Sequence, residues 1–155
     1  MSEKLGVGII GAGNISAAYL RLSPNFVGVE VRAVADINMD AASARAEEFG
    51  VRAETVDGLL ASDDISIIIN LTIPAAHFEV SKRILEAGKH VYSEKPLALN
   101  AADALEMTEA AEKAGVKTLV GFNYIKNPTV QLAKEIIARA KKSPEVSSNL
   151  NKVAP

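Results

Sequence analysis

The chain has 155 residues, a hydrophobic fraction of 48% and a formal net charge of −2. This length suits one globular domain with a proper core and is too short for two domains of ordinary size. The small negative charge gives no support to nucleic-acid binding or to binding of an anionic membrane surface. Without cysteine there is no disulfide or thiolate chemistry, and without a run of ~18 apolar residues we expect a soluble, cytoplasmic protein.

The first part of the chain combines a glycine turn with two apolar strands. A strand over 5–10 leads into Gly11-Ala12-Gly13-Asn14-Ile15-Ser16, a helical segment follows, and a second strand over 29–35 ends on Asp36. This order is typical of the first half of a dinucleotide-binding βαβ unit. Gly11 permits the tight turn, and Gly13 lacks the Cβ that would keep a pyrophosphate away from the N–H groups at the helix start. Ser16 stands where a third glycine is usual.

Asp36 indicates which dinucleotide is preferred. It lies 25 residues after Gly11, close to the roughly 20-residue spacing of the acid that accepts hydrogen bonds from the adenosine ribose. A carboxylate there repels a 2′-phosphate, so NAD is favoured over NADP. A glycine fingerprint alone also fits a plain turn between two core elements, but the strand, helix and acid around it favour the dinucleotide site.

The middle of the chain alternates short helices and strands. The expected elements are a helix over 40–49 that ends at Gly50, an extended piece over 51–55, a short helix over 56–61 and a strand over 65–71. The nearly continuous branched apolar residues of 65–71 are typical of a central parallel strand. Pro74 breaks the next loop, 72–77. Because ligands of open α/β sheets bind beyond the carboxyl ends of strands, this loop and the glycine turn should share one crevice.

The second half continues the alternation. A helix that buries Val80, Ile84 and Ala87 ends at Gly88, and a strand covers 90–92. Asn100 caps a helix with Ala101, Leu105, Thr108 and Ala111 on one face, which ends at Gly115. A strand over 117–120 and a helix opened by Pro128 follow. The whole pattern predicts an α/β fold, a doubly wound parallel sheet of about six strands with helices on both faces.

The most unusual polar group is Glu94-Lys95-Pro96, which follows the strand over 90–92. A lysine beside a nicotinamide ring would donate a hydrogen bond to a substrate oxygen or stabilise a developing alkoxide, while Glu94 orients it or contacts the ribose. Pro96 fits a cis peptide bond. Taken alone, these residues fit a surface ion pair at a strand end better than a catalytic role. His77 and His90 lack zinc-ligand spacing, so no metal site is expected.

Several of these motifs together resemble one family. They are Gly8-Ile9-Ile10-Gly11-Ala12-Gly13-Asn14-Ile15, Ala33-Val34-Ala35-Asp36, Thr72-Ile73-Pro74 with His77, Ala87-Gly88-Lys89-His90-Val91 with Glu94-Lys95-Pro96, and Gly121-Phe122-Asn123-Tyr124 with Pro128. The chain resembles the Gfo/Idh/MocA oxidoreductases, the family of glucose-fructose oxidoreductase and inositol dehydrogenase, over about residues 4–140. The Glu-Lys-Pro element makes this resemblance far more specific than the glycine fingerprint.

The resemblance implies a division of the chain. Residues 1–122 would form a Rossmann domain that binds NAD or NADP. Residues 123–142 would form a linker helix that in relatives leads into a substrate domain, and 143–155 would be a loose tail. The substrate domain would then be absent, as in a truncated chain.

The resemblance also implies roles for individual residues. Gly11, Gly13, Asn14 and Ile15 would hold the pyrophosphate and Asp36 the adenosine ribose. Thr72, Pro74 and His77 would line the cofactor groove, Glu94 would lie near the nicotinamide, Lys95 would be the active-site lysine, and Asn123 would approach the nicotinamide end.

The implied activity is hydride transfer between a nicotinamide cofactor and a sugar or cyclic polyol, with Lys95 stabilising the substrate oxygen. Two alternatives stay open: a stand-alone dinucleotide-binding module without turnover, and another Rossmann protein such as a methyltransferase, which would bind S-adenosylmethionine more tightly than NADH. Neither a nucleic acid nor a membrane is expected as partner. Relatives assemble through the sheet of the substrate domain, so homo-oligomerisation is an open expectation.

Overall fold

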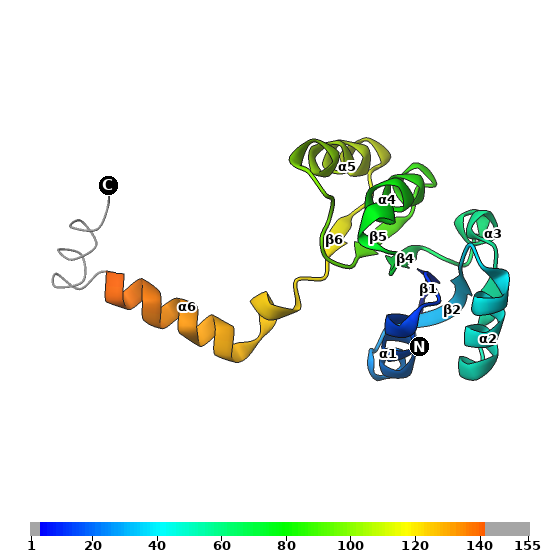
Figure 1. Ribbon diagram of the computed structural model, residues 1–155, viewed down its shortest axis with the longest axis horizontal. Coiled ribbons are helices and arrows are strands. Elements are labelled where there is room, and N and C mark those ends of the chain that lie inside the picture. The colour runs from blue at the N-terminus through cyan, green and yellow to red at the C-terminus, as the bar shows by residue number, and fades with distance from the viewer. Residues whose placement is uncertain (1–3, 142–155) are drawn as a thin grey trace. The chain divides into compact units, whose positions relative to one another are not determined.

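The computed structural model describes residues 4–141, which fall into two compact units divided between Gly121 and Phe122. Unit 1 contains, in order (Figure 1), β1 (Leu5–Ile10), α1 (Asn14–Leu22), η1 (Ser23–Asn25), β2 (Val29–Ala35), α2 (Met39–Phe49), β3 (Arg52–Glu54), α3 (Val56–Ala61), β4 (Ile67–Asn70), η2 (Pro74–Ala76), α4 (His77–Glu86), β5 (His90–Ser93), α5 (Ala101–Ala114) and β6 (Thr118–Val120). Unit 2 contains η3 (Asn123–Lys126) and α6 (Pro128–Lys141), which contact each other. The tail predicted over 143–155 lies outside the described residues.

The sheet of unit 1 has six strands in the order β3-β2-β1-β4-β5-β6. Every neighbouring pair is parallel, which confirms the predicted doubly wound fold. The chain moves outward from β1 to β3 and then returns to place β4 on the other side of β1, so the strand order reverses between β1 and β4. Open α/β sheets bind ligands at this reversal, beyond the carboxyl ends of the strands. The strand predicted over 65–71 is shorter, Ile67–Asn70.

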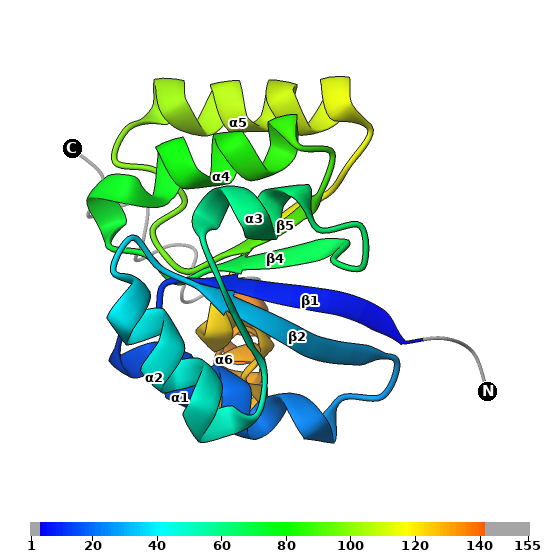
Figure 2. The ribbon, with the colours of Figure 1, turned by 90° about the vertical axis from the view of Figure 1, so that its right-hand side faces the viewer.

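Helices cover both faces of the sheet, as Figure 2 shows with α3, α4 and α5 on one side and α1 and α2 on the other. Two separate apolar clusters match these layers. Neighbouring residues of β1 divide between them, because Ile10 packs with Leu59 of α3 and Ile9 packs with Leu20 of α1. This alternation is the two-residue period of a strand that is buried on both faces.

The predicted buried faces of two helices are partly wrong. In α5 the buried side chains are Met107 and Ala111, whereas Leu105 is 61% exposed and Thr108 faces solvent. At the end of α4, Ala87 is exposed. Alanine-rich helices carry weakly apolar residues on several faces, so helical spacing alone does not decide which face meets the sheet.

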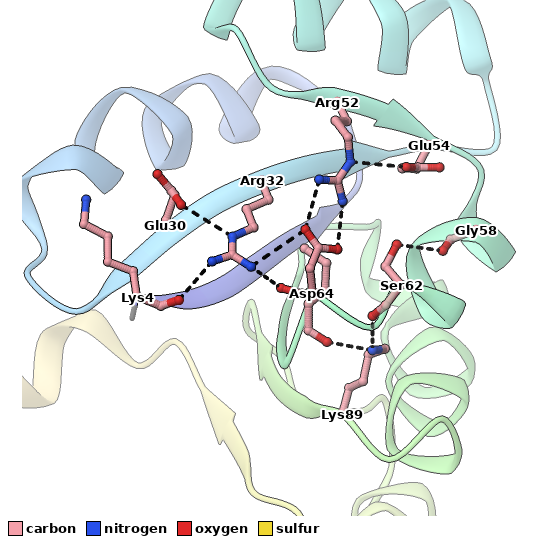
Figure 3. A network of polar contacts seen from close by, with 10 residues as sticks. Lys4, Glu30, Arg32, Arg52, Glu54, Gly58, Ser62, Asp64 and Lys89 are labelled. Atoms are coloured by element: carbon pink, nitrogen blue, oxygen red, sulfur yellow. Dashed lines mark hydrogen bonds and ion pairs between the residues drawn. The ribbon is translucent and has the colours of Figure 1, made fainter. Parts of the chain in front are cut away.

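Polar contacts join the strands at the amino-terminal edge of the sheet (Figure 3). Arg32 of β2 donates to the Asp64 carbonyl at 2.8 Å, and Arg52 of β3 donates to both carboxylate oxygens of Asp64 at 3.0 Å. Lys89 is 9% exposed and donates to the carbonyls of Ser62 and Ile65 at 2.7 and 2.6 Å. These contacts anchor the loop before β4 at the edge opposite to the glycine turn.

No helix among residues 4–141 combines the length and the apolar character that crossing a membrane requires.

Candidate functional site

Gly11 and Gly13 occupy very different surroundings in the turn between β1 and α1. Gly11 has a φ of +110°, and a Cβ at this position would lie 2.7 Å from the carbonyl carbon and oxygen of Leu71. A side chain there meets both an unfavourable backbone conformation and a neighbouring main chain. Gly13 has a φ of −68°, and a Cβ there would meet no protein atom within 4 Å. The space beside Gly13 is therefore open to a ligand.

The start of α1 presents backbone donors to solvent. Asn14 and Ile15 are exposed, and within the described residues no side chain caps α1. Three other helices of unit 1 do have side-chain caps, namely Asn38 for α2, Thr55 for α3 and Asn100 for α5. The first N–H groups of a helix lack intrahelical partners and carry partial positive charge, so this turn suits an anionic group. Ser16 is buried, and its hydroxyl donates to the Gly13 carbonyl at 2.6 Å.

Asp36 lies beside the same turn at the end of β2. One carboxylate oxygen accepts from the Ala12 N–H at 2.7 Å, and the other accepts from the Asn38 N–H at 2.9 Å. An ionised carboxylate has about four acceptor positions. Asp36 can therefore hold the glycine turn and still accept hydrogen bonds from the hydroxyls of a ligand.

Asn70 organises the loop that follows β4. It is fully buried, and its amide group donates to the His77 carbonyl at 3.1 Å and to the Ser81 hydroxyl at 2.9 Å. Its carbonyl oxygen accepts from the N–H of Thr72 at 3.1 Å and from the hydroxyl of Thr72 at 2.7 Å. All four hydrogen-bonding positions of the side-chain amide are in use, so Thr72 is held in a defined position.

His77 joins the loops that follow β4 and β5. Its ring is 1% exposed, with Nδ1 2.6 Å from the Pro96 carbonyl oxygen and Nε2 2.9 Å from the Thr72 carbonyl oxygen. Each ring nitrogen thus faces a main-chain carbonyl, and a neutral ring donates its one N–H to one of the two. The sequence predicts that His77 lines the cofactor groove. In the structure its ring is instead enclosed between the two loops. The Lys95–Pro96 peptide bond is cis, as the sequence suggests.

Glu94 and Lys95 extend beyond the end of β5. Glu94 is 7% exposed; its Oε1 accepts from the Tyr19 hydroxyl at 2.5 Å and its Oε2 accepts from the Lys95 N–H at 3.2 Å. Burial and the bond to Glu94 raise the pKa of Tyr19, so its hydroxyl stays a donor. The Lys95 side chain is exposed, and no ion pair found among residues 4–141 includes it. The structure therefore does not support a surface ion pair between these neighbours.

A groove of about 320 Å³ lies between the glycine turn and the loop after β4. Four of the predicted site residues line it: Gly11, Gly13, Asp36 and Thr72. The remaining lining is mostly apolar, with one charged residue: Ile10, Ile37, Val56, Leu71, Ile73, Ala76, Val80 and Arg83. An apolar hollow with a few convergent polar groups is the usual form of a small-molecule site.

The sequence analysis does not identify two features of this region, Asn70 and Tyr19. Asn70 ends an isoleucine run, and a buried polar residue at the end of a strand is a signal that could have identified it. Tyr19 gives no such signal, because its partner Glu94 lies 75 residues away.

Asn123 begins η3 in unit 2, and its predicted contact with the nicotinamide end stays a prediction.

The fold and the groove define a dinucleotide-binding domain of the Rossmann type. Residues 5–122 match the sequence model of a protein family described as an oxidoreductase family with an NAD-binding Rossmann fold. The chain belongs to this family, the Gfo/Idh/MocA oxidoreductases, as its motifs indicate.

Similar proteins include several sugar and polyol dehydrogenases. Inositol 2-dehydrogenase of Salmonella typhimurium is 37% identical over 123 residues, which are 76% of this chain and 37% of that protein. The structure of GenD2 from gentamicin A biosynthesis in complex with NAD has 30% identity and a TM-score of 0.81, over 88% of this chain and 39% of that one. KijD10, a 3-ketoreductase from Actinomadura kijaniata in complex with NADP, has 27% identity and a TM-score of 0.82, over 89% and 45%. The chain thus spans less than half the length of these relatives.

Proposed function

We propose that this chain binds NAD across the carboxyl ends of β1, β2, β4 and β5 and serves an oxidoreductase that acts on a sugar or cyclic polyol. The observation that carries the proposal is the groove that brings the open space of Gly13 and the carboxylate of Asp36 together. Family membership supports the cofactor, and the named dehydrogenase relatives support the substrate class.

The residues of the glycine turn fit the adenosine half of NAD. Gly11 and Gly13 bring the main chain close to the pyrophosphate, and the exposed first turn at Asn14 and Ile15 donates N–H groups to it. Asp36 accepts hydrogen bonds from the ribose hydroxyls and repels a 2′-phosphate, so NAD is preferred over NADP. The apolar lining of the groove, with Thr72 at its edge, offers a surface for the adenine ring.

The strand order supports placing the nicotinamide half near Lys95. Asp36 follows β2 and Lys95 follows β5, which are three strand spacings apart in the sheet, or about 14 Å. An extended dinucleotide can bridge such a separation. Bound NAD supplies a carbon that accepts or returns a hydride. The Lys95 ammonium group would donate a hydrogen bond to the oxygen on the reacting substrate carbon and stabilise its negative charge as it develops. Glu94, Pro74 and His77 would shape and support this end.

The test is a calorimetric titration of the chain with NADH, NADPH and S-adenosylmethionine, followed by a turnover screen with NAD and a panel of cyclic polyols and sugars. We expect NADH to bind most tightly. Tighter binding of S-adenosylmethionine, or no binding of NADH at millimolar concentration, would overturn the proposal. NADH binding without turnover would support a stand-alone binding module instead of an enzyme. Where a substrate turns over, Lys95→Met should lower kcat at least about 100-fold and leave NADH affinity unchanged.

A further inference from the structure

Tyr19 connects the glycine-turn helix to the strand end that carries Lys95. It lies on α1, three residues after the buried Ser16, and its hydroxyl reaches the Glu94 carboxylate at 2.5 Å. This bond joins two elements on opposite sides of the strand-order reversal, because α1 follows β1 and Glu94 follows β5. The bond thus couples these two parts of the proposed NAD site.

The Glu94 carboxylate depends on few partners. It is 7% exposed, and Oε1 and Oε2 accept from different elements, the Tyr19 hydroxyl and the Lys95 N–H. No cation pairs with Glu94 in the described residues. A buried carboxylate without a counter-ion relies on its hydrogen bonds for both its energy and its direction. Removing the Tyr19 hydroxyl would leave Oε1 without its donor and free the carboxylate to rotate.

Tyr19 is itself held in place. Its ring packs edge-on against Tyr92 of β5, with ring centroids 6.3 Å apart and an interplanar angle of 63°. Such T-shaped pairs are favourable in proteins. The hydroxyl therefore meets Glu94 from a side chain whose position α1 and β5 both determine.

We propose that Tyr19 is a positioning residue that aims the Glu94 carboxylate at the nicotinamide half of NAD. The inference rests on the proposed function, since it requires that NAD lies with its nicotinamide end toward β5. Tyr19 acts through Glu94 and touches neither the cofactor nor the substrate. Its effect should consequently appear for ligands that contain the nicotinamide riboside and disappear for those that lack it.

The experiment compares Tyr19→Phe with wild type in the binding of two ligands, NADH and ADP. ADP keeps the adenosine and the pyrophosphate and lacks the whole nicotinamide riboside. We expect Tyr19→Phe to bind NADH about tenfold more weakly, as for the loss of one hydrogen bond to a charged group, and to bind ADP within twofold of wild type. Ser23→Ala, which removes a hydroxyl that donates to the Leu20 carbonyl and makes no contact with Glu94, is the control and should bind both ligands like wild type.

A double-mutant cycle with Glu94→Ala tests whether Tyr19 works through Glu94. If it does, Tyr19→Phe should cause no further loss of NADH affinity in the Glu94→Ala background. An equal loss for NADH and ADP would show that Tyr19 has only a general structural role, and unchanged NADH affinity would also overturn the inference. Failure of the wild-type chain to bind NADH would instead overturn the proposed function, so the two ideas fail on different measurements.

Discussion

Only Ala12 separates Gly11 from Gly13, yet the structure predicts different results when each is replaced by alanine. Gly11→Ala places a side chain at a φ of +110° and against the Leu71 main chain, so we expect it to lower the free energy of unfolding by roughly 1–3 kcal/mol or more. Gly13→Ala meets open space at an ordinary φ. Its reduced backbone entropy in the unfolded state stabilises by about 0.4–1 kcal/mol, which the poorer helix cap offsets.

Urea unfolding and NADH titration of both variants separate the two roles. Gly13→Ala should unfold like wild type and bind NADH more weakly, because its methyl group enters the space assigned to the pyrophosphate. A Gly13→Ala variant with full NADH affinity would contradict that assignment, whatever the stability of Gly11→Ala.

Asp36 should decide between the two nicotinamide dinucleotides. Asp36→Asn removes the charge that repels a 2′-phosphate and weakens the bonds to the ribose hydroxyls, so NADH affinity should fall about tenfold while NADPH affinity holds or rises. The ratio of the two dissociation constants, measured by titration, checks this. Asp40→Asn, an exposed acid in the first turn of α2, is the control, and a similar change in the ratio for both variants would argue against a specific role of Asp36.

At the scale of elements, His77 should control how firmly the loops after β4 and β5 are held together. His77→Phe keeps a ring of similar shape and removes both contacts to the carbonyls of Thr72 and Pro96. The free energy of unfolding should fall by roughly 1–3 kcal/mol. Hydrogen exchange should also become faster over 72–76 and 94–97. His90→Phe loses only one bond, from the Lys117 N–H, and should leave exchange over 72–76 unchanged; equal effects of the two variants would exclude a specific role of His77 in joining the loops.

Most elements can be predicted from the sequence because their local signals are strong. Branched apolar runs form the inner strands, and the predicted stops at Gly50 and Gly115 are helix C-caps with a φ of 68°. The rotation of a helix about its axis is harder to predict. In α5 the buried face differs from the predicted face by about one position along the helix, so Leu105 is exposed and Met107 lies in the core. The alanine-rich pattern allows both arrangements.

At the scale of the whole molecule, the contacts around Asp64 predict how stability responds to acid. The Arg52 guanidinium holds the pKa of Asp64 below its ordinary value. A carboxylate with a lowered folded-state pKa contributes stability above its unfolded pKa and loses that contribution as pH falls through the folded pKa. The benefit is modest because the pair is partly exposed and screened by solvent.

Melting temperatures of wild type and Asp64→Asn between pH 7 and pH 2.5 test this. Wild type should be the more stable protein at neutral pH, and the difference should shrink as pH falls below about 4 and close at the acidic end. The exposed neighbour Asp63→Asn should show a smaller difference throughout. A gap between wild type and Asp64→Asn that does not vary with pH would mean that the Asp64 charge does not matter.

The candidate site is only partly predictable from the sequence, because some of its contacts are local in the chain and others are not. Gly11, Gly13 and Asp36 belong to one βαβ unit, so their spacing in the chain determines that they meet in the groove. The bond from Tyr19 to Glu94 and the four bonds of Asn70 depend on how a helix or loop lies against the finished sheet. Such contacts follow from tertiary packing and leave no periodic trace in the sequence.

The strand order also determines how unit 1 would respond to mechanical force. β1 lies inside the sheet and hydrogen-bonds to β2 on one side and β4 on the other. Tension applied at Lys4 and Gly121 would pull β1 and the parallel strand β6 in opposite directions along their axes. The bonds between β1 and β4 lie between the two points of attachment and would be loaded in shear, whereas β2 and β3 lie beyond β1 on the other side. β1, whose last residue lines the ligand groove, would thus also resist mechanical extension of the chain.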